Sequence, residues 1–174
     1  MARDTVAPEV KILFERETIR KRISQLSDAI KERYPDAGNL LIIPLQTGAM
    51  FFAVDLLRSF RGSQRPMISS VIVNTRDFSG SYFGKTRDLA RGRDLLILDD
   101  IFDTGKTLED VYNYYKNCGA KTICSCFLLN KRIPKVTDLK PDFIGFDVED
   151  LYIVGYGLDA DERYRELENI GYLE

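Results

Sequence analysis

Histidine is absent from the chain, which excludes catalytic triads, imidazole metal sites and imidazole general bases. Any proton transfer must therefore involve Asp, Glu, Lys, Tyr or Cys. The sequence contains three cysteines, Cys118, Cys124 and Cys126, and this odd number at this spacing fits no zinc-site pattern. We expect buried structural thiols, with Cys124 and Cys126 on one face of a strand.

Long apolar runs and charge imbalance are also lacking. No run approaches the roughly 20 residues that span a bilayer, and residues 1–11 lack the apolar core of a signal peptide. The net charge is −2 without an acidic or basic tail, so the composition offers no footprint for nucleic acid or a membrane. At 174 residues and 44% hydrophobic, the sequence predicts a single cytoplasmic globular domain over residues 1–174.

Alternating helix and strand patterns predict a parallel α/β sheet. The expected helices are 17–34, 49–60 and 106–118, and the expected strands are 39–45, 68–74, 94–98, 122–129, 143–146 and 153–156, followed by a turn or short helix at 159–167. Right-handed crossovers in such sheets leave ligand sites beyond the carboxyl ends of the strands. The loops 46–48 and 99–107 fit that description.

The segment 95–108, LLILDDIFDTGKTL, carries the most informative pattern. A buried strand is followed by two carboxylates, Asp99 and Asp100, and a turn with Thr and Gly leads into a helix. Amide groups at a helix N-terminus, with nearby threonine hydroxyls, favour phosphate. The carboxylates would repel phosphate unless they bind ribose hydroxyls or hold Mg²⁺, which prefers oxygen ligands. The pattern therefore predicts a site for a sugar phosphate that carries a second, metal-bound phosphate group.

Two other interpretations of this segment are weaker. An ordinary surface turn, with Asp103 capping the helix, would rarely combine an Asp pair, a third Asp and the run TGKT after a buried strand. A nucleoside-triphosphatase loop requires G-x-x-x-x-G-K-[ST], and its first glycine would fall on Asp100. A carboxylate there would intrude where the backbone must approach phosphate, so we reject this interpretation.

Residues 95–107 resemble the phosphoribosyl-pyrophosphate signature of type I phosphoribosyltransferases, which is an apolar strand, two acidic residues, two apolar residues and D-T-G-x-T. The resemblance covers nearly the whole chain and points to the hypoxanthine-guanine branch through residues 131–132, 140–146 and 154–159 and the helix 17–34. It implies a parallel sheet core flanked by helices, with a small hood built from N- and C-terminal segments. It also implies transfer of the 5-phosphoribosyl group from phosphoribosyl pyrophosphate to hypoxanthine or guanine, with Mg²⁺ as cofactor, by a homodimer or homotetramer.

The resemblance assigns roles to individual residues. Asp103 would be the catalytic base or proton relay near purine N7. The ribose and 5-phosphate would be held by Asp99, Asp100, Asp103, Thr104, Gly105, Lys106 and Thr107; the pyrophosphate by Leu45, Gln46, Thr47, Gly48 and Arg165; the purine by Lys131, Tyr152, Ile153 and Asp159; and the metal by Asp99, Asp100 and Asp159. A lysine at 131 donates hydrogen bonds without accepting them, which favours a 6-oxopurine over adenine. Without the resemblance, simpler roles stay open: a solvated charge for Lys131, a core aromatic ring for Tyr152, and an ordinary surface pair for Asp159 and Arg165.

Two features depart from the usual family pattern. Gln46 stands where many relatives have Lys or a small residue, so it supplies no charge for pyrophosphate; the resemblance also predicts a strained or cis Leu45–Gln46 bond. The family's mobile loop opens with a Ser-Tyr pair, here Ser81 and Tyr82, but the chain from there to Asp99 is shorter than in typical relatives. We therefore expect a small lid and a contribution from a partner subunit.

Two alternative functions remain open at this point. One is a 6-oxopurine phosphoribosyltransferase that prefers xanthine. The other is a non-catalytic regulator that senses phosphoribosyl ligands and binds nucleic acid through a basic face formed by Arg58, Arg61, Arg65 and residues 85–93. The chain is too short for an added DNA-binding domain, so nucleic acid is an unexpected partner.

Overall fold

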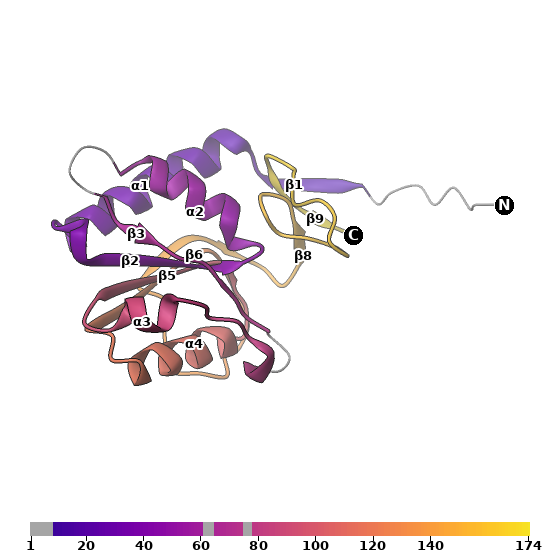
Figure 1. Cartoon of the computed structure of the whole chain (residues 1–174). Helices are drawn as coiled ribbons and strands as arrows, with labels where there is room; N and C mark the ends of the chain where they lie inside the picture. The colour runs from indigo at the N-terminus through magenta and orange to yellow at the C-terminus, as the bar shows by residue number, and fades with distance from the viewer. Residues whose placement is uncertain (1–8, 61–64, 75–77) are drawn as a thin grey trace.

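The central feature of the structure is a six-stranded parallel sheet (Figure 1). This computed structural model describes residues 9–60, 65–74 and 78–174. The strands of this sheet are β2 (Leu40–Gln46), β3 (Met67–Ile68), β4 (Val71–Ile72), β5 (Asp94–Phe102), β6 (Thr122–Lys131) and β7 (Phe143–Val148). Their order is β3-β2-β5-β6-β7, with β4 also paired to β2, and every pairing is parallel. The predicted parallel α/β core is confirmed.

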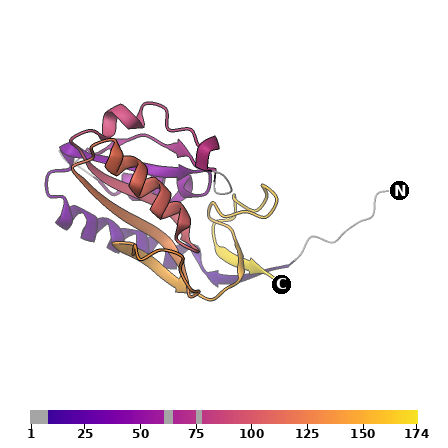
Figure 2. The same cartoon turned by 90° about the horizontal axis from the view of Figure 1, so that it is seen from below.

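Helices cover both faces of this sheet. The helices α1 (Arg16–Arg33) and α2 (Ala49–Arg58) lie on one face, and α3 (Thr86–Ala90) and α4 (Lys106–Asn117) lie on the other (Figure 1). Viewed from below, α4 lies in front of the sheet (Figure 2). Leu40 and Ile42 of β2 pack into the core beneath α1 and α2, whereas Leu41 and Ile43 pack into the core beneath α4, because successive side chains of a strand point to opposite faces. The near-continuous apolar runs of the sequence therefore serve two cores at once.

A second, three-stranded antiparallel sheet stands at one end of the molecule (Figure 1). It has the order β1-β9-β8, where β1 is Val10–Phe14, β8 is Tyr152–Val154 and β9 is Ile170–Leu173. The rings of Phe14 and Phe146 stack with centroids 4.1 Å apart and join this sheet to β7. The predicted hood of N- and C-terminal segments is this sheet, which also carries the tyrosine and isoleucine expected at the purine.

Some predicted boundaries were wrong, for identifiable physical reasons. The strand expected to end at residue 98 continues to Phe102, because β6 provides pairing partners as far as Asn130. The strand expected at 68–74 is divided into β3 and β4 at Ser69 and Ser70, where the Ser69 amide donates to the Ile42 carbonyl at 3.1 Å. The segment 159–167 forms turns, which is one of the two expected structures. The strands β1 and β9 were not anticipated, because their apolar patterns are too short to stand out.

Two further expectations, on membrane-spanning helices and on the cysteines, can be compared with the structure. Within the described ranges, no helix has both the length and the apolar character needed to cross a bilayer. The three cysteines carry free thiols, and Cys124 and Cys126 are buried in the core beneath α1 and α2. The expectation that these two thiols share one face of a strand is therefore confirmed.

Candidate active site

Two adjoining cavities open at the carboxyl ends of β5 and β6. One encloses about 280 Å³ and is lined by the end of β5 and the first residues of α4. The other encloses about 210 Å³ between the sheet and the hood. Ile101 and Asp103 line both cavities, so their side chains form a shared wall. The first cavity contains residues predicted to hold the sugar phosphate, and the second contains those predicted to hold the purine.

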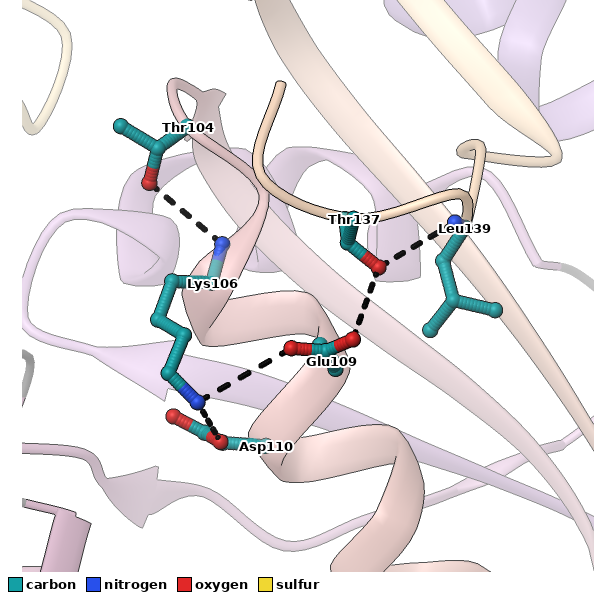
Figure 3. Close-up of polar contacts among 6 residues, drawn as sticks. All are labelled: Thr104, Lys106, Glu109, Asp110, Thr137 and Leu139. Atoms are coloured by element: carbon teal, nitrogen blue, oxygen red, sulfur yellow. Dashed lines mark hydrogen bonds and ion pairs between the residues drawn. The ribbon is translucent and has the colours of Figure 1, made fainter.

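The larger of these cavities is built around the N-terminus of α4. Gly105 has a φ of 89°, and a Cβ there would lie 2.6 Å from Thr137 Cγ2, so glycine alone fits this turn. The Lys106 amide faces Thr104 Oγ1 at 3.4 Å, whereas the Lys106 side chain runs along the helix to Asp110 (Figure 3). An anion in this cavity would therefore meet backbone amides and the helix dipole. Asp103 is exposed, and the side-chain oxygen facing the first amide of α4 belongs to Thr104, so Asp103 is not the helix cap.

Asp99 and Asp100 occupy half-buried positions in β5, not the turn beyond it. Asp99 Oδ1 accepts a hydrogen bond from the Asp100 amide at 3.0 Å. Burial, with the charge of Asp100, raises the pKa of Asp99 well above its usual value. Burial also raises the pKa of Asp100, although hydrogen bonds from the backbone and the charge of Arg165 oppose this rise. A cation between these carboxylates would relieve both the desolvation and the repulsion.

This carboxylate pair fits a magnesium ion that arrives with its substrate. Across the described parts of the chain, no cluster of three or more His, Cys, Asp or Glu side chains forms a complete metal cage. Magnesium usually takes one or two carboxylates and fills its remaining positions with phosphate oxygens and water. The donor set therefore suits a metal–phosphate complex better than a permanently bound ion.

The smaller cavity combines one cation with apolar and aromatic walls. Lys131 is the last residue of β6, and its Nζ donates to Asp150 Oδ1 at 3.0 Å, which leaves two of its three donors available. Tyr152 is 59% exposed at this cavity, whereas Ile153 is buried. An exposed ring beside a buried aliphatic residue provides a surface on which a planar base can stack.

The loop 46–48 lies against Asp100. A Cβ on Gly48 would stand only 1.7 Å from Asp100 Oδ2, so the two residues meet without room for a side chain. The cis peptide bond is Gln46–Thr47, so the predicted position at Leu45–Gln46 was wrong. The reason is that β2 continues through Gln46, which pairs with β4, and the bend follows it. The Gln46 side chain donates to Ser70 Oγ at 2.6 Å.

Asp159 and Arg165 do form a pair, with Arg165 Nη2 2.8 Å from Asp159 Oδ1. Arg165 also donates to the Gly157 carbonyl at 2.7 Å, and a Cβ on Gly157 would lie 2.2 Å from the Gly48 carbonyl. The turn that carries Arg165 therefore packs directly on the loop 46–48. The second oxygen of Asp159 accepts the Glu162 amide at 3.0 Å, so both oxygens are already engaged.

Ser81 and Tyr82, which open the predicted lid, lie next to β4 and close to the loop 46–48. Tyr82 forms an antiparallel bridge with Ile72, and Ile72 pairs with Gln46. The side chain of Tyr82 is 67% exposed. Ser81 Oγ accepts a hydrogen bond from the Asn74 amide at 2.8 Å. The chain from Tyr82 to Asp99 is largely taken up by α3 and β5.

A model of the phosphoribosyl transferase domain matches residues 11–161, which is most of the chain. The chain belongs to this family. The hypoxanthine phosphoribosyltransferase of Escherichia coli (strain K12) is 34% identical over 172 residues, covering 93% of this chain and 94% of the relative. The hypoxanthine-guanine phosphoribosyltransferase of Bacillus subtilis (strain 168) is 36% identical over 168 residues, covering 94% and 93%.

The fold agrees with that assignment. The hypoxanthine phosphoribosyltransferase of Trypanosoma cruzi, solved in complex with the product IMP, superposes with a TM-score of 0.85 at 30% identity, covering 99% of this chain and 94% of that one. The type I phosphoribosyltransferase fold predicted from the signature is confirmed, as is membership of the hypoxanthine-guanine branch. The roles of individual residues stay predictions.

One segment of this phosphoribosyltransferase was missed at the sequence level. Residues 135–137 cross the back of the phosphate loop, where the Val136 amide donates to the Thr104 carbonyl at 2.9 Å. Thr137 Oγ1 lies 3.2 Å from Glu109 Oε1 on α4 (Figure 3). The segment has no periodic apolar pattern, so only its contacts reveal that it belongs to the site.

Proposed function

We propose that the protein transfers the 5-phosphoribosyl group of phosphoribosyl pyrophosphate to hypoxanthine or guanine and releases pyrophosphate, a reaction of purine salvage. The observation that carries this proposal is the pair of cavities sharing Asp103 and Ile101. A nucleoside monophosphate bound across that wall would place its phosphate at the N-terminus of α4 and its base beside Lys131. The reacting sugar carbon would then lie near the carboxylate of Asp103.

Base recognition would depend on the lysine and the hood. Lys131 can donate to an exocyclic oxygen at purine C6, and it has no acceptor for the amino group of adenine. The ring of Tyr152 would stack on the purine, and the backbone of Ile153 would meet the edge of the base. These contacts hold the purine in line with the ribose, which lowers the entropic cost of reaching the transition state.

The displacement itself would use the carboxylates of β5 and the loops around them. Asp103 would accept or relay the proton lost from the purine, while Asp99 and Asp100 hold the ribose hydroxyls. Mg²⁺ held by Asp99 and Asp100 with the pyrophosphate oxygens would stabilise the charge on the leaving group. Asp159 would help to hold a second Mg²⁺ only by releasing Arg165 or the Glu162 amide, which now engage its two oxygens. Arg165 and the amides of residues 45–48 would bind the same pyrophosphate.

Steady-state assays with hypoxanthine, guanine, xanthine and adenine, each with phosphoribosyl pyrophosphate and Mg²⁺, test the proposal. Hypoxanthine or guanine should give the highest kcat/KM, and adenine should be a poor substrate. Highest efficiency with xanthine would correct the base preference and leave the reaction class intact. If no base gives a nucleotide and the protein binds RNA or DNA in a salt-dependent way, the proposed enzyme activity is wrong and the protein is a sensor that binds nucleic acid.

We also propose a homodimer or homotetramer. Phe51 and Val54 on α2 are 41% and 39% exposed, and beside them a cavity of about 650 Å³ lies between α1, α2 and the hood. That cavity contains none of the residues predicted to bind the sugar phosphate, pyrophosphate or purine, and it mixes arginines with acidic side chains, so it suits a protein surface better than a substrate. Light scattering coupled to size exclusion would show a single 19.9 kDa species if the proposal is wrong.

A further inference from the structure

Lys135 connects the two halves of the proposed active site. Its Nζ donates to the carbonyl oxygens of Asp103 at 2.6 Å, Lys131 at 2.5 Å and Phe102 at 3.2 Å. All three donors of the ammonium group are therefore used. Asp103 lies in the phosphate loop after β5, whereas Lys131 ends β6 beside the purine cavity.

Lys135 supplies hydrogen bonds to three carbonyls at the point where the pairing of β5 with β6 ends. They lie at the carboxyl ends of β5 and β6, where the parallel ladder between the two strands stops at Phe102 and Asn130. A carbonyl withdrawn from water without a partner is costly, so a cation that serves three of them stabilises the edge. The ammonium also lies 4.7 Å from the centroid of the Phe102 ring, which adds a cation–π contact.

The surrounding segment supports the same arrangement. The Val136 amide binds the Thr104 carbonyl, and Thr137 packs against Gly105 and faces Glu109 (Figure 3). Burial lowers the pKa of Lys135, while the charge of Asp103 opposes that shift. The contacts of Val136 and Thr137 place the partly exposed Lys135 against the back of the phosphate loop.

We propose that Lys135 is a positioning residue that locks Asp103, on the phosphate side, to Lys131, on the purine side, by binding both main-chain carbonyls with one ammonium group. This proposal rests on the function proposed above. The transfer requires the base and the sugar carbon at about 3–3.5 Å with aligned orbitals, and a misplacement of about 1 Å costs roughly 10²-fold in rate. A single cation spanning the two strand ends fixes their separation without touching substrate.

Two variants separate positioning from packing. Lys135→Met keeps the apolar stem over Phe102 and removes all three hydrogen bonds, whereas Lys135→Arg retains a donor group of similar length. Lys140→Met is the matched control, because Lys140 is exposed in the same connection and has no hydrogen bond or ion pair within the described part of the chain.

The kinetic constants for both substrates should move together in Lys135→Met. We expect KM to rise about 10-fold for phosphoribosyl pyrophosphate and for hypoxanthine, and kcat to fall about 10- to 100-fold. Lys135→Arg should recover most of the loss, and Lys140→Met should match the parent. Parental kcat and both parental KM values in Lys135→Met would overturn the proposal, as would a loss of kcat that only follows a lower folded fraction in thermal melts.

Amide hydrogen exchange without substrate gives an independent measurement. The Val136 amide should exchange faster in Lys135→Met than in the parent, because its hydrogen bond to Thr104 depends on the locked loop. Unchanged exchange of the Val136 amide would overturn the proposed positioning role of Lys135, even if the parent is active. An inactive parent with faster exchange in the variant would instead overturn the proposed function and leave the link between the two loops supported.

Discussion

The contact between Gly48 and Asp100 gives the sharpest test of the proposed site. In Gly48→Ala the new Cβ would start 1.7 Å from Asp100 Oδ2 and 2.6 Å from Asp100 Cγ. Ordinary contact begins near 3.4 Å, so the carboxylate or the loop must retreat by about 1.7 Å. Asp100 is half-buried and the turn around Gly157 packs on the other side of the loop, so neither can move freely.

The expected loss follows from this displacement. A misplacement of about 1 Å at a reacting centre costs roughly 10²-fold, which corresponds to about 2.7 kcal/mol in kcat/KM. The loss should concern phosphoribosyl pyrophosphate, because the loop 46–48 and Asp100 are proposed to hold its pyrophosphate and ribose. The free energy of unfolding should also fall by about 1–3 kcal/mol, because the overpacked methyl group strains its neighbours even though alanine easily adopts the helical φ of −56° at this position.

Steady-state kinetics with each substrate varied in turn provides the assay. Gly38→Ala is the matched control, because Gly38 precedes the opposite end of β2 and a Cβ there meets only Asp36 Oδ1 at 3.1 Å. In an Asp100→Ala background the effect of Gly48→Ala should largely disappear, because the clash has no partner left. Parental kcat/KM in Gly48→Ala, or full additivity with Asp100→Ala, would refute the reasoning.

Three further predictions concern single side chains. Lys131→Ala should raise KM for hypoxanthine and guanine about 10- to 100-fold, because a hydrogen bond to a charged group is worth about 1.5–3 kcal/mol; steady-state assays measure it. Asp103→Asn should lower kcat about 10²-fold with smaller changes in KM, because the amide cannot take up the proton; single-turnover rates measure it. Burial raises the pKa of Asp94, but hydrogen bonds, including those from Thr122 and Lys121, outweigh burial and lower it. A lowered folded-state pKa gives stability that is present above the unfolded value near 4 and is lost as pH falls, so Asp94→Asn should flatten acid unfolding curves.

Each of these variants has a matched control. Arg132→Ala removes the neighbouring exposed pair with Glu149 and should leave base KM unchanged. Asp138→Asn changes an exposed carboxylate and should keep kcat. Asp28→Asn, in an exposed pair with Lys31, should retain the parental acid dependence. An unchanged base KM in Lys131→Ala, turnover at the parental rate in Asp103→Asn, or an unaltered acid transition in Asp94→Asn would each remove the corresponding assignment.

Periodic and repeated features were predictable along the chain. The heptad-like spacing of Ile19, Ile23, Leu26 and Ile30 located α1 within one residue at each end, because a helix buries one face at that spacing. The apolar runs of β2 and β6 were found for the same kind of reason. The extent of β5 was not, because the carboxylates of Asp99 and Asp100 interrupt the apolar pattern while the pairing with β6 continues.

The sequence by itself determined the family of this protein and the position of its phosphate loop, because an Asp pair and D-T-G-x-T after a buried strand form a contiguous local pattern. Only the tertiary structure decided which distant residues share the site. The approach of Gly48 to Asp100, the pairing of Arg165 with Asp159 and the bridge from Lys135 to Asp103 and Lys131 all join separate segments. Such contacts depend on strand order and loop packing, which no local pattern of residues encodes.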